Sequence, residues 1–337
     1  MAGCTSGSAS SSRPSAASDN SAVSACAVTP VADKVVPTVV TIAAHGPGGS
    51  GTGSGEVIRP DGYILTNNHV ISIAASSVGS VEVEFSDGQA EAATITGRDP
   101  QSDLAVLKVQ ASRQLAVISL GSSSSVQVGE PVVAIGAPLG LSGTVTSGIV
   151  SALNRTVEVP GENDKSALLV SALQTDASIN PGNSGGALVN CAGQLVGVPT
   201  AGATVPSPSG QSAGGSIGLG FAIPVDLAKY IADEIIATGR VTHAFFGVQT
   251  VPIPPAAAAQ AGVAEGLFVQ AVTAGGPAAT AGLRPDDVIT SIDGKPATSN
   301  IQLQELTLTK KPGDTVSIGY DRAGHSANVT ITLAAQP

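Results

Sequence analysis

The sequence predicts a mainly β protein, and three features support that prediction. Apolar residues make up 42% of the 337 residues, enough for buried cores, and with no Trp and few Phe or Tyr they are largely Val, Ile, Leu and Ala. β-Branched residues of this kind favour strands. Short apolar runs alternate with Gly, Asp and Asn turn signals, as in a barrel or sandwich. A clear helical pattern, residues 226–238, is followed by Gly239 and then by further strands.

Composition along the chain predicts a tether and two domains. Residues 1–27 are rich in Ser and Ala and have almost no large apolar side chains, so they cannot offset the entropy of folding and are expected to be disordered. Residues 28–240 form the larger predicted domain, which ends just after the helix. Residues 241–337 form a second, smaller domain.

In the larger domain we expect strands at residues 35–42, 56–58, 63–66, 81–85, 104–109, 132–135, 144–150, 187–189, 195–198 and 218–224. The glycine-rich run 46–55 is expected to be a loop, and polar residues 154–166 and 202–216 are expected to form further loops, the first of them mobile. In the smaller domain we expect strands at 266–272, 287–292, 315–320 and 327–333 and a short helix at 300–308, while 253–261 is Pro- and Ala-rich.

Two classes of ligand are excluded by motif context and charge. Gly46, Gly48 and Gly51 match G-x-G-x-x-G, but a dinucleotide site needs a helix directly after this loop, and here a hairpin turning at Asp61-Gly62 follows. The net charge is −10 and no basic cluster occurs, which argues against binding to nucleic acid or to an anionic membrane. No apolar run is long enough for a transmembrane helix.

The chain contains three cysteines, Cys4, Cys26 and Cys191, without metal-ligand spacing, so no metal site is expected. The start, Met-Ala-Gly-Cys4 before a Ser-rich tail, resembles the processing site of a bacterial lipoprotein, although the basic and apolar regions of a signal peptide do not precede it. We therefore expect the given start to lie near the mature end, with Cys4 lipidated; the alternative is an ordinary cytoplasmic start. Lipidation of Cys4 leaves Cys26 and Cys191 as a disulfide pair in an oxidising compartment.

Ser184 stands between small residues in the run Gly182-Asn183-Ser184-Gly185-Gly186. A tight turn there could expose the hydroxyl and aim backbone N–H groups at a developing oxyanion, as acyl transfer requires. The alternative is an ordinary Gly- and Ser-rich turn. The run also fits G-x-S-x-G of α/β-hydrolases, but that fold needs a helix after the serine and a later histidine.

The order His69, Asp103, Ser184 on a chain that reads as β is instead that of chymotrypsin-like enzymes. Each residue alone has an ordinary explanation: a loop histidine, an aspartate before a strand, a serine in a turn. Taken together, each in its expected structural context, the three favour a protease. No cofactor is expected.

Residues 66–70, 103–109 and 174–186 resemble the signatures of the HtrA (Deg) serine proteases, and the resemblance extends over residues 28–335. It implies a trypsin-like double β-barrel followed by a small α+β PDZ domain. His69 would then be the general base, Asp103 would orient its imidazole, and Ser184 would attack the carbonyl. The backbone N–H groups of Gly182 and Ser184 would form the oxyanion hole.

Two inferences follow from this resemblance. Neutral Asn183 cannot form the ion pair that activates trypsin-like zymogens, so activation is expected from ordering of the loops 154–166 and 202–216, unless these loops are merely surface. Near the cleavage-site pocket, 178–179, 199–201 and 220–222 contain no acidic residue, which favours small aliphatic substrate residues over Lys or Arg. Pro199 departs from the asparagine expected in the family.

In the smaller domain, residues 245–248 resemble the carboxylate-binding loop of a PDZ domain, and 275–289 are a fuller PDZ signature. The N–H groups around Phe246, Gly247 and Val248 could hold a peptide C-terminus, while the peptide adds a strand to the sheet and the helix 302–308 lines its groove. The alternative is that Phe245 and Phe246 only fill a core, and we expect that one of them does.

The sequence therefore predicts an extracytoplasmic serine endopeptidase that degrades misfolded or exposed polypeptides and is tethered to the membrane through a lipid on Cys4. The family resemblance implies a homotrimer. Two alternatives stay open at this stage: a proteolytically silent PDZ adaptor or holdase chaperone, and a small-ester hydrolase. Labelling of Ser184 by a fluorophosphonate separates the first from a protease, and cleavage of a protein substrate separates the second.

Overall fold

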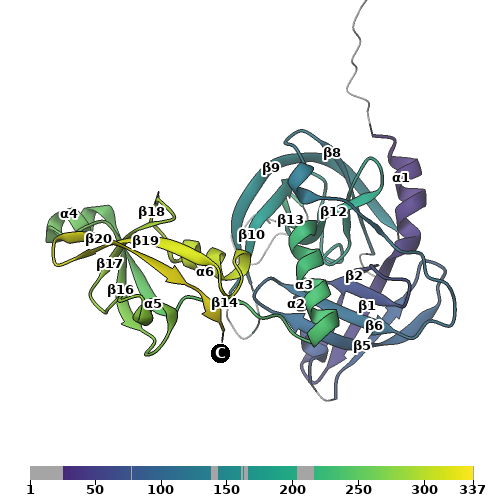
Figure 1. The fold of residues 1–337 in the computed structure, drawn as a ribbon. Coiled ribbons are helices and arrows are strands. Elements are labelled where there is room, and N and C mark those ends of the chain that lie inside the picture. The colour runs from purple at the N-terminus through teal and green to yellow at the C-terminus, as the bar shows by residue number, and fades with distance from the viewer. Residues whose placement is uncertain are drawn as a thin grey trace, which may run out of the picture.

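The structure, a computed structural model, describes residues 26–76, 78–137, 143–160, 162, 166–202 and 216–336. It is mainly β, as predicted, with two β-barrel halves followed by a smaller domain (Figure 1). The predicted tether 1–27 falls almost entirely outside the described residues. Among the residues that are described, no helix combines the length and apolar character needed to cross a bilayer.

The first barrel is closed, with strand order β1-β2-β3-β6-β5-β4. Its strands are β1 (Val39–Gly46), β2 (Gly49–Val57), β3 (Tyr63–Thr66), β4 (Ser80–Glu84), β5 (Ala90–Asp99) and β6 (Leu104–Val109). Two short helical segments, α2 (Asn68–Ile71) and η2 (Ser72–Ala74), connect β3 to β4. Aliphatic side chains such as Ile42, Ile64 and Leu107 fill its interior.

The second half is a seven-stranded sheet of order β11-β8-β9-β10-β13-β12-β7, and an additional β11–β12 pairing closes six of these strands into a ring, with β7 outside it. Its strands are β7 (Ser119–Leu120), β8 (Pro131–Gly136), β9 (Thr144–Pro160), β10 (Ser166–Thr175), β11 (Ala187–Asn190), β12 (Gln194–Gly202) and β13 (Gly220–Pro224). The short η3 (Ser123–Ser125) follows β7.

Helix α3 (Val225–Thr238) covers the seam between the two barrels. Ile231 and Ile235, on the stripe that the sequence predicted, are buried in a cluster with Leu65 and Leu104 of the first barrel and Ile223 of the second. Gly239 ends the helix in the left-handed region, φ 80°, where glycine is favoured. The predicted helix is thus confirmed, with its start one residue earlier.

The smaller domain is a sheet of order β15-β16-β17-β19-β20, in which β18 pairs with β17, and a separate β14–β21 pair lies beside it. Its elements are β14 (Ala244–Phe245), β15 (Val248–Ile253), α4 (Pro255–Ala261), β16 (Gly266–Val272), α5 (Pro277–Thr280), β17 (Val288–Ile292), β18 (Lys295–Pro296), α6 (Asn300–Thr309), β19 (Thr315–Arg322), β20 (His325–Thr332) and β21 (Ala334–Ala335). The four strands and the helix expected here are confirmed.

Three local expectations were wrong. Residues 35–36 are helical, in α1 (Val28–Val35) and η1 (Val36–Thr38), because Val31 and Val35 pack on the second barrel. The glycine run 46–55 lies largely in β2, where glycine permits close packing: a Cβ at Gly55 would meet Ile64 and Ile42. The expected loop 154–166 is mostly strand, because β9 runs to Pro160 and pairs with β10.

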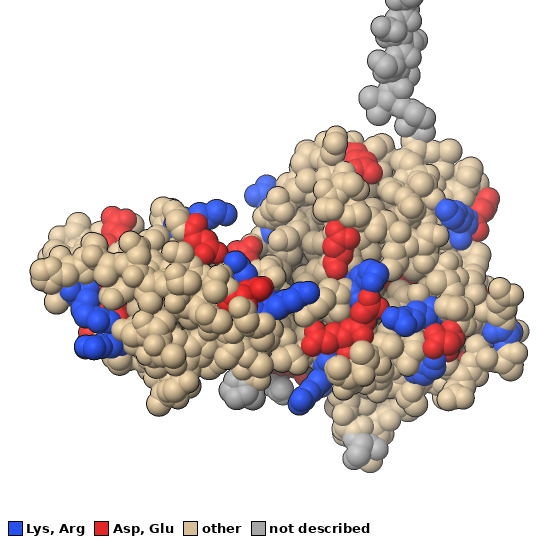
Figure 2. All heavy atoms as spheres, viewed as in Figure 1, with Lys and Arg blue, Asp and Glu red and all other residues tan. Residues whose placement is uncertain are grey.

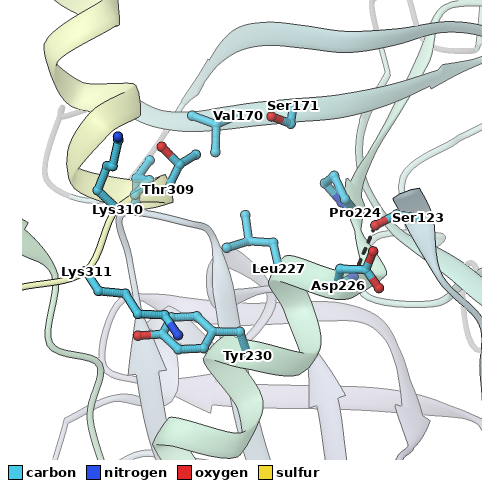
Figure 3. A pocket seen from close by; sticks show the side chains of 11 residues that line it. Ser123, Val170, Ser171, Pro224, Asp226, Leu227, Tyr230, Thr309, Lys310 and Lys311 are labelled. Atoms are coloured by element: carbon cyan, nitrogen blue, oxygen red, sulfur yellow. Dashed lines mark hydrogen bonds between the residues drawn. The ribbon is translucent and has the colours of Figure 1, made fainter. Parts of the chain in front are cut away.

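The smaller domain meets the two-barrel body at β10 and α3. Leu168 and Val170 of β10 pack with Leu308 of α6, and Leu227 of α3 borders this contact. A cavity of about 400 Å³ lies beside it, with Lys311 over the ring of Tyr230 on one side and Asp226 near Ser123 on the other (Figure 3). Acidic and basic side chains are interspersed on the face drawn in Figure 2, without one single-sign patch.

Candidate active site

His69 lies in the first turn of α2, directly after β3 of the first barrel. The two residues before it tie this turn to the β5–β6 loop: the Asn67 side-chain amide donates to the carbonyl of Asp103 at 2.8 Å, and the Asn68 N–H donates to the same carbonyl at 3.1 Å. The imidazole is 40% exposed, so a substrate can reach it. The expected loop histidine therefore sits on a short helix whose start is anchored.

The carboxylate of Asp103 is almost fully buried, with its side chain 4% exposed, and it receives three hydrogen bonds. His69 contributes two of them: its backbone N–H at 3.0 Å and its Nδ1 at 2.8 Å. Thr200 Oγ1 donates the third. Because an ionised carboxylate only accepts, Nδ1 carries the proton and Nε2 is left as the basic nitrogen.

Ser184 lies in a tight turn of the second barrel that rests on the first. Gly182 has φ 101° and Gly185 has φ 78°, values that residues with a Cβ rarely adopt. A Cβ at Gly185 would in addition overlap the Ser54 carbonyl. Ser54 of β2 donates from Oγ to the Gly182 carbonyl at 2.6 Å and from its N–H to the Ser184 carbonyl at 2.8 Å. The turn that carries the serine is thus held by a residue of the first barrel.

The structure brings His69 and Asp103 into direct contact and links both indirectly to Ser184. Ser184 Oγ donates to the carbonyl of Thr200 at 3.3 Å, and the hydroxyl of the same threonine donates to Asp103. No hydrogen bond within the described part of the chain joins Ser184 Oγ to His69, and none there uses the N–H of Gly182 or of Ser184.

Two residues of this arrangement were missed by sequence reasoning. Thr200 was noted only as a neighbour of the specificity pocket, and Ser54 only as part of a glycine-rich loop. Ser54 additionally accepts a hydrogen bond from the Ala137 N–H at 2.8 Å, so it is held on both sides. Nothing in the local sequence distinguishes these hydroxyls from many other Ser and Thr side chains, because their contacts join distant strands.

Asn183 and the residues expected to line the cleavage-site pocket, 178–179, 199–201 and 220–222, are all non-acidic. Asn183 is buried, and its amide donates to the Ser178 carbonyl at 3.2 Å. Ile179 is also buried, and a Cβ at Gly220 would collide with it. The preference for small aliphatic residues at the cleavage site stays a prediction.

One of the two expected activation segments reaches the neighbour of His69. Glu162, between β9 and β10, accepts a hydrogen bond from the Asn68 side chain at 2.9 Å and forms an ion pair with Arg98, which also donates to Asn68 at 3.0 Å. Most of the other segment, 203–215, lies outside the described residues. That these two segments control activity stays a prediction.

The loop expected to bind a carboxylate lies at the entrance to the smaller domain. Phe246 is buried in that domain's core, whereas Phe245 is partly exposed, so one of the two fills the core as expected. The carbonyls of Phe246 and Gly247 accept from Ala278 and Thr273 at 3.1 and 2.9 Å, and Gly247 has φ 85°. Val248 begins β15, the edge strand of the sheet, which is where a peptide strand could add.

The structure joins Cys26 and Cys191 in a disulfide, with Cα atoms 5.3 Å apart. The bond attaches the residue that precedes α1 to the β11–β12 turn of the second barrel. Cys4 lies outside the described residues.

Comparison with known proteins agrees with this architecture. Residues 53–198 match the trypsin-like peptidase domain family, and residues 244–333 match the PDZ domain family. The serine protease PepD of Mycobacterium tuberculosis is 48% identical over 90% of this chain and 65% of its own length. The periplasmic pH-dependent serine endoprotease DegQ of Escherichia coli is 40% identical over 84% of this chain and 59% of its own length. The chain thus spans about three fifths of the length of these relatives.

Solved structures match over nearly their whole length. The HtrA-type protease AlgW with a decapeptide has a TM-score of 0.72 and is 33% identical, covering 92% of this chain and 99% of that one. The serine endoprotease from Yersinia pestis has a TM-score of 0.67 and is 34% identical, covering 92% and 98%. With these similarities and its trypsin-like and PDZ domains, the chain belongs to the HtrA-type serine protease family.

Proposed function

We propose that this chain is a serine endopeptidase in which Ser184 is the nucleophile, His69 the general base and Asp103 the carboxylate that orients the base. The observation that carries the proposal is the chain of contacts from His69 to Asp103, Thr200 and Ser184. In the reaction, His69 Nε2 removes the proton of the Ser184 hydroxyl while Ser184 Oγ attacks the peptide carbonyl. His69 then gives this proton to the leaving amine. Asp103 stabilises the imidazolium formed between these two steps.

The oxyanion of the tetrahedral intermediate is proposed to accept from the N–H groups of Gly182 and Ser184. These donors have no partner among the described residues, and the turn is held by Ser54 before substrate arrives. Donors that are already oriented stabilise the developing charge without reorganisation during the reaction. The imidazole needs only to approach the serine, so loop movement around His69 or Ser184 would set the activity.

Ser184→Ala tests the nucleophile directly. We expect cleavage of unfolded casein and labelling by a fluorophosphonate to fall to background, while thermal unfolding changes little. Ser147→Ala, an exposed serine of β9, is the matched control and keeps full activity. Cleavage of casein by the Ser184 variant would refute Ser184 as the nucleophile, whereas absence of cleavage by the wild type would favour a silent adaptor or chaperone.

The smaller domain is proposed to bind peptide C-termini at Phe246, Gly247 and Val248. The peptide would pair with β15, but one position of this edge is already occupied: the Asn300 amide donates to the Thr250 carbonyl at 2.9 Å. A peptide longer than about two residues must therefore displace Asn300 or leave the strand there. A fluorescent peptide with a free carboxylate should bind, and the same peptide with a C-terminal amide should not; equal binding would contradict carboxylate recognition.

An extracytoplasmic location, a homotrimer and exposed or misfolded polypeptides as substrates complete the proposal. The periplasmic relatives and the Cys26–Cys191 disulfide support the location, because disulfides persist in oxidising compartments. Light scattering after size-exclusion chromatography measures the oligomer. Intact mass of the protein purified from membranes decides whether Cys4 carries a lipid, and an unmodified thiol would contradict the anchor.

A further inference from the structure

The segment that leaves the two-barrel body lies directly against β5. After α3, a Cβ at Gly97 of β5 would overlap the carbonyl of Gly239, so the two backbones touch. Val241 then packs on the apolar cluster between the barrels. This segment is therefore a fixed part of the body rather than a free linker, and it delivers His243 to the end of β5.

His243 and Asp99 form a buried pair at this point. His243 Nε2 lies 2.7 Å from Asp99 Oδ1, and both side chains are at most 8% exposed. Ser102 Oγ donates to the other carboxylate oxygen of Asp99, and the Gln101 N–H donates to Oδ1 at 3.3 Å. Asp99 thus links the short loop that follows it, residues 100–103, to His243 at the start of the smaller domain.

That loop ends at Asp103, the proposed triad carboxylate. Asp99 and Leu104 face one another as the last and first paired residues of β5 and β6, so residues 100–103 form a tight hairpin. Asp103 itself has φ 56°, a left-handed conformation that residues with a Cβ adopt only occasionally. Such a conformation persists only where surrounding contacts hold it.

The same histidine is tied to the smaller domain. Its carbonyl accepts from the Gln336 N–H at 2.9 Å, and the Gln336 side chain accepts from Gln101 at 2.9 Å. Ala244, the next residue, begins β14, and Phe246 of the proposed carboxylate-binding loop is only two residues further. The loop proposed to hold a peptide and the loop that holds the triad carboxylate therefore share one anchor.

We propose that His243 is a positioning residue for the reaction: through Asp99 and Ser102 it sets the place of Asp103, and so couples docking of the smaller domain to the orientation of His69. The inference rests on the proposed function, because it needs Asp103 to act on the base. His243 touches neither substrate nor the reacting atoms. Its loss should lower the turnover of bound substrate and leave substrate binding nearly unchanged.

The test compares two amide side chains at the same position in the full chain. In His243→Gln the side-chain amide reaches the place of the imidazole Nε2 and can donate to Asp99; in His243→Asn it reaches only the place of Nδ1. We expect His243→Asn to lower kcat about tenfold with KM within about twofold, the scale of one lost hydrogen bond to a charged group. His243→Gln should recover kcat to within about threefold of the wild type.

His325→Asn is the matched control, since it makes the same change at an exposed histidine of β20 outside this anchor; its kcat should stay within about twofold. Active-site titration with a fluorophosphonate corrects each kcat for the folded fraction. Equal kcat values for the Gln and Asn variants, or a loss that appears only in KM or in thermal stability, would overturn the positioning role. An active Ser184→Ala enzyme would overturn the proposed function itself, so the two failures are distinguishable.

Discussion

The two sides of the proposed active site are built differently. On the first-barrel side, His69 and Asp103 are joined by two hydrogen bonds, and the Asp103 carbonyl also fixes the residues before the histidine. On the second-barrel side, the Ser184 hydroxyl points to a backbone carbonyl, that of Thr200, and its turn is held from outside by Ser54. Both residues of the acid–base half come from one barrel, and the second barrel adds only the hydrogen bond from Thr200, whereas the nucleophile half depends on how the barrels meet.

This difference teaches where control can act. Because the imidazole of His69 and the carboxylate of Asp103 are already paired, regulation can act mainly on the position of the pair as a unit. The serine turn and the contacts that cross between barrels or domains can shift without unfolding either barrel. Contacts such as Ser54 with Gly182 and His243 with Asp99 are therefore the places where small changes should alter turnover.

Of the changes considered in this comparison, Asp103→Asn should lower kcat most, because it disrupts the pair of His69 and Asp103. A neutral amide can present its N–H to Nδ1 and stabilise the wrong tautomer, and it no longer stabilises the imidazolium; we expect kcat to fall about 10⁴-fold. Hydrolysis of a chromogenic peptide measures this. Asp87→Asn, an exposed loop aspartate of the same barrel, is the control. A loss below about tenfold would mean that Asp103 does not orient the base.

Removing the Cys26–Cys191 disulfide tests whether this bond stabilises the second barrel. Cys26 and Cys191 are 165 residues apart in sequence, and loss of a native disulfide costs about 2–5 kcal/mol. Cys26→Ser with Cys191→Ser should lower the unfolding temperature while kcat of the folded enzyme stays close to that of the wild type, because the bond joins the β11–β12 turn, at the ends of these strands away from Ser184 and Thr200. If the double variant had the same unfolding temperature as the wild type under oxidising conditions, the disulfide would not contribute to stability.

Ser54→Ala sharpens the comparison by loosening the serine turn alone. It leaves the Gly182 carbonyl and the Ala137 N–H without their partner, and an unsatisfied buried group costs about 1–3 kcal/mol. We expect kcat to fall about 10–100-fold with a smaller change in KM. Ser50→Ala on the exposed end of the same strand should be neutral. Equal kcat for both variants would show that the turn does not need support from the first barrel.

Substitution of Glu56 should have the smallest effect on activity, and it tests the surface between the barrels through its effect on stability. It lies opposite Val39 and Leu65, which pack between the barrels, and its fully buried carboxylate oxygens have no hydrogen-bond partner among the described residues. Burial raises the pKa of Glu56 well above its ordinary value of 4.5. The stability from this shift is fully present below about pH 4.5 and is lost as the pH rises through the raised pKa.

Glu56→Gln removes the ionisable group and should therefore be more stable than the wild type at pH 8 by about 1–3 kcal/mol, with little difference near pH 4. Denaturant unfolding at both pH values measures it. A constant difference at the two pH values would show that Glu56 does not titrate on unfolding. The result would indicate whether the interface between the barrels is loosened at high pH.

Much of the fold could be predicted from local pattern. The apolar run 104–109 coincides with β6, and residues 227, 231 and 235 marked the stripe of α3, because a strand or helix that buries one face repeats its apolar residues at a fixed period. The errors occurred where packing between elements decided the conformation, as at Val35 and in the glycines of β2. A glycine reads as a loop signal in sequence, yet here it allows two strands of a barrel to approach.

By itself, the sequence determined the mainly β class, the seam helix and the candidates His69, Asp103 and Ser184, since this chemistry restricts which residue types can serve and the order of the three indicates the fold that carries them. The tertiary structure alone decided that Thr200 contacts Asp103, that Ser54 contacts the Ser184 turn and that His243 pairs with Asp99. Those contacts join residues roughly 100 or more positions apart, and hydrogen bonds between such distant residues leave no periodic trace in the chain.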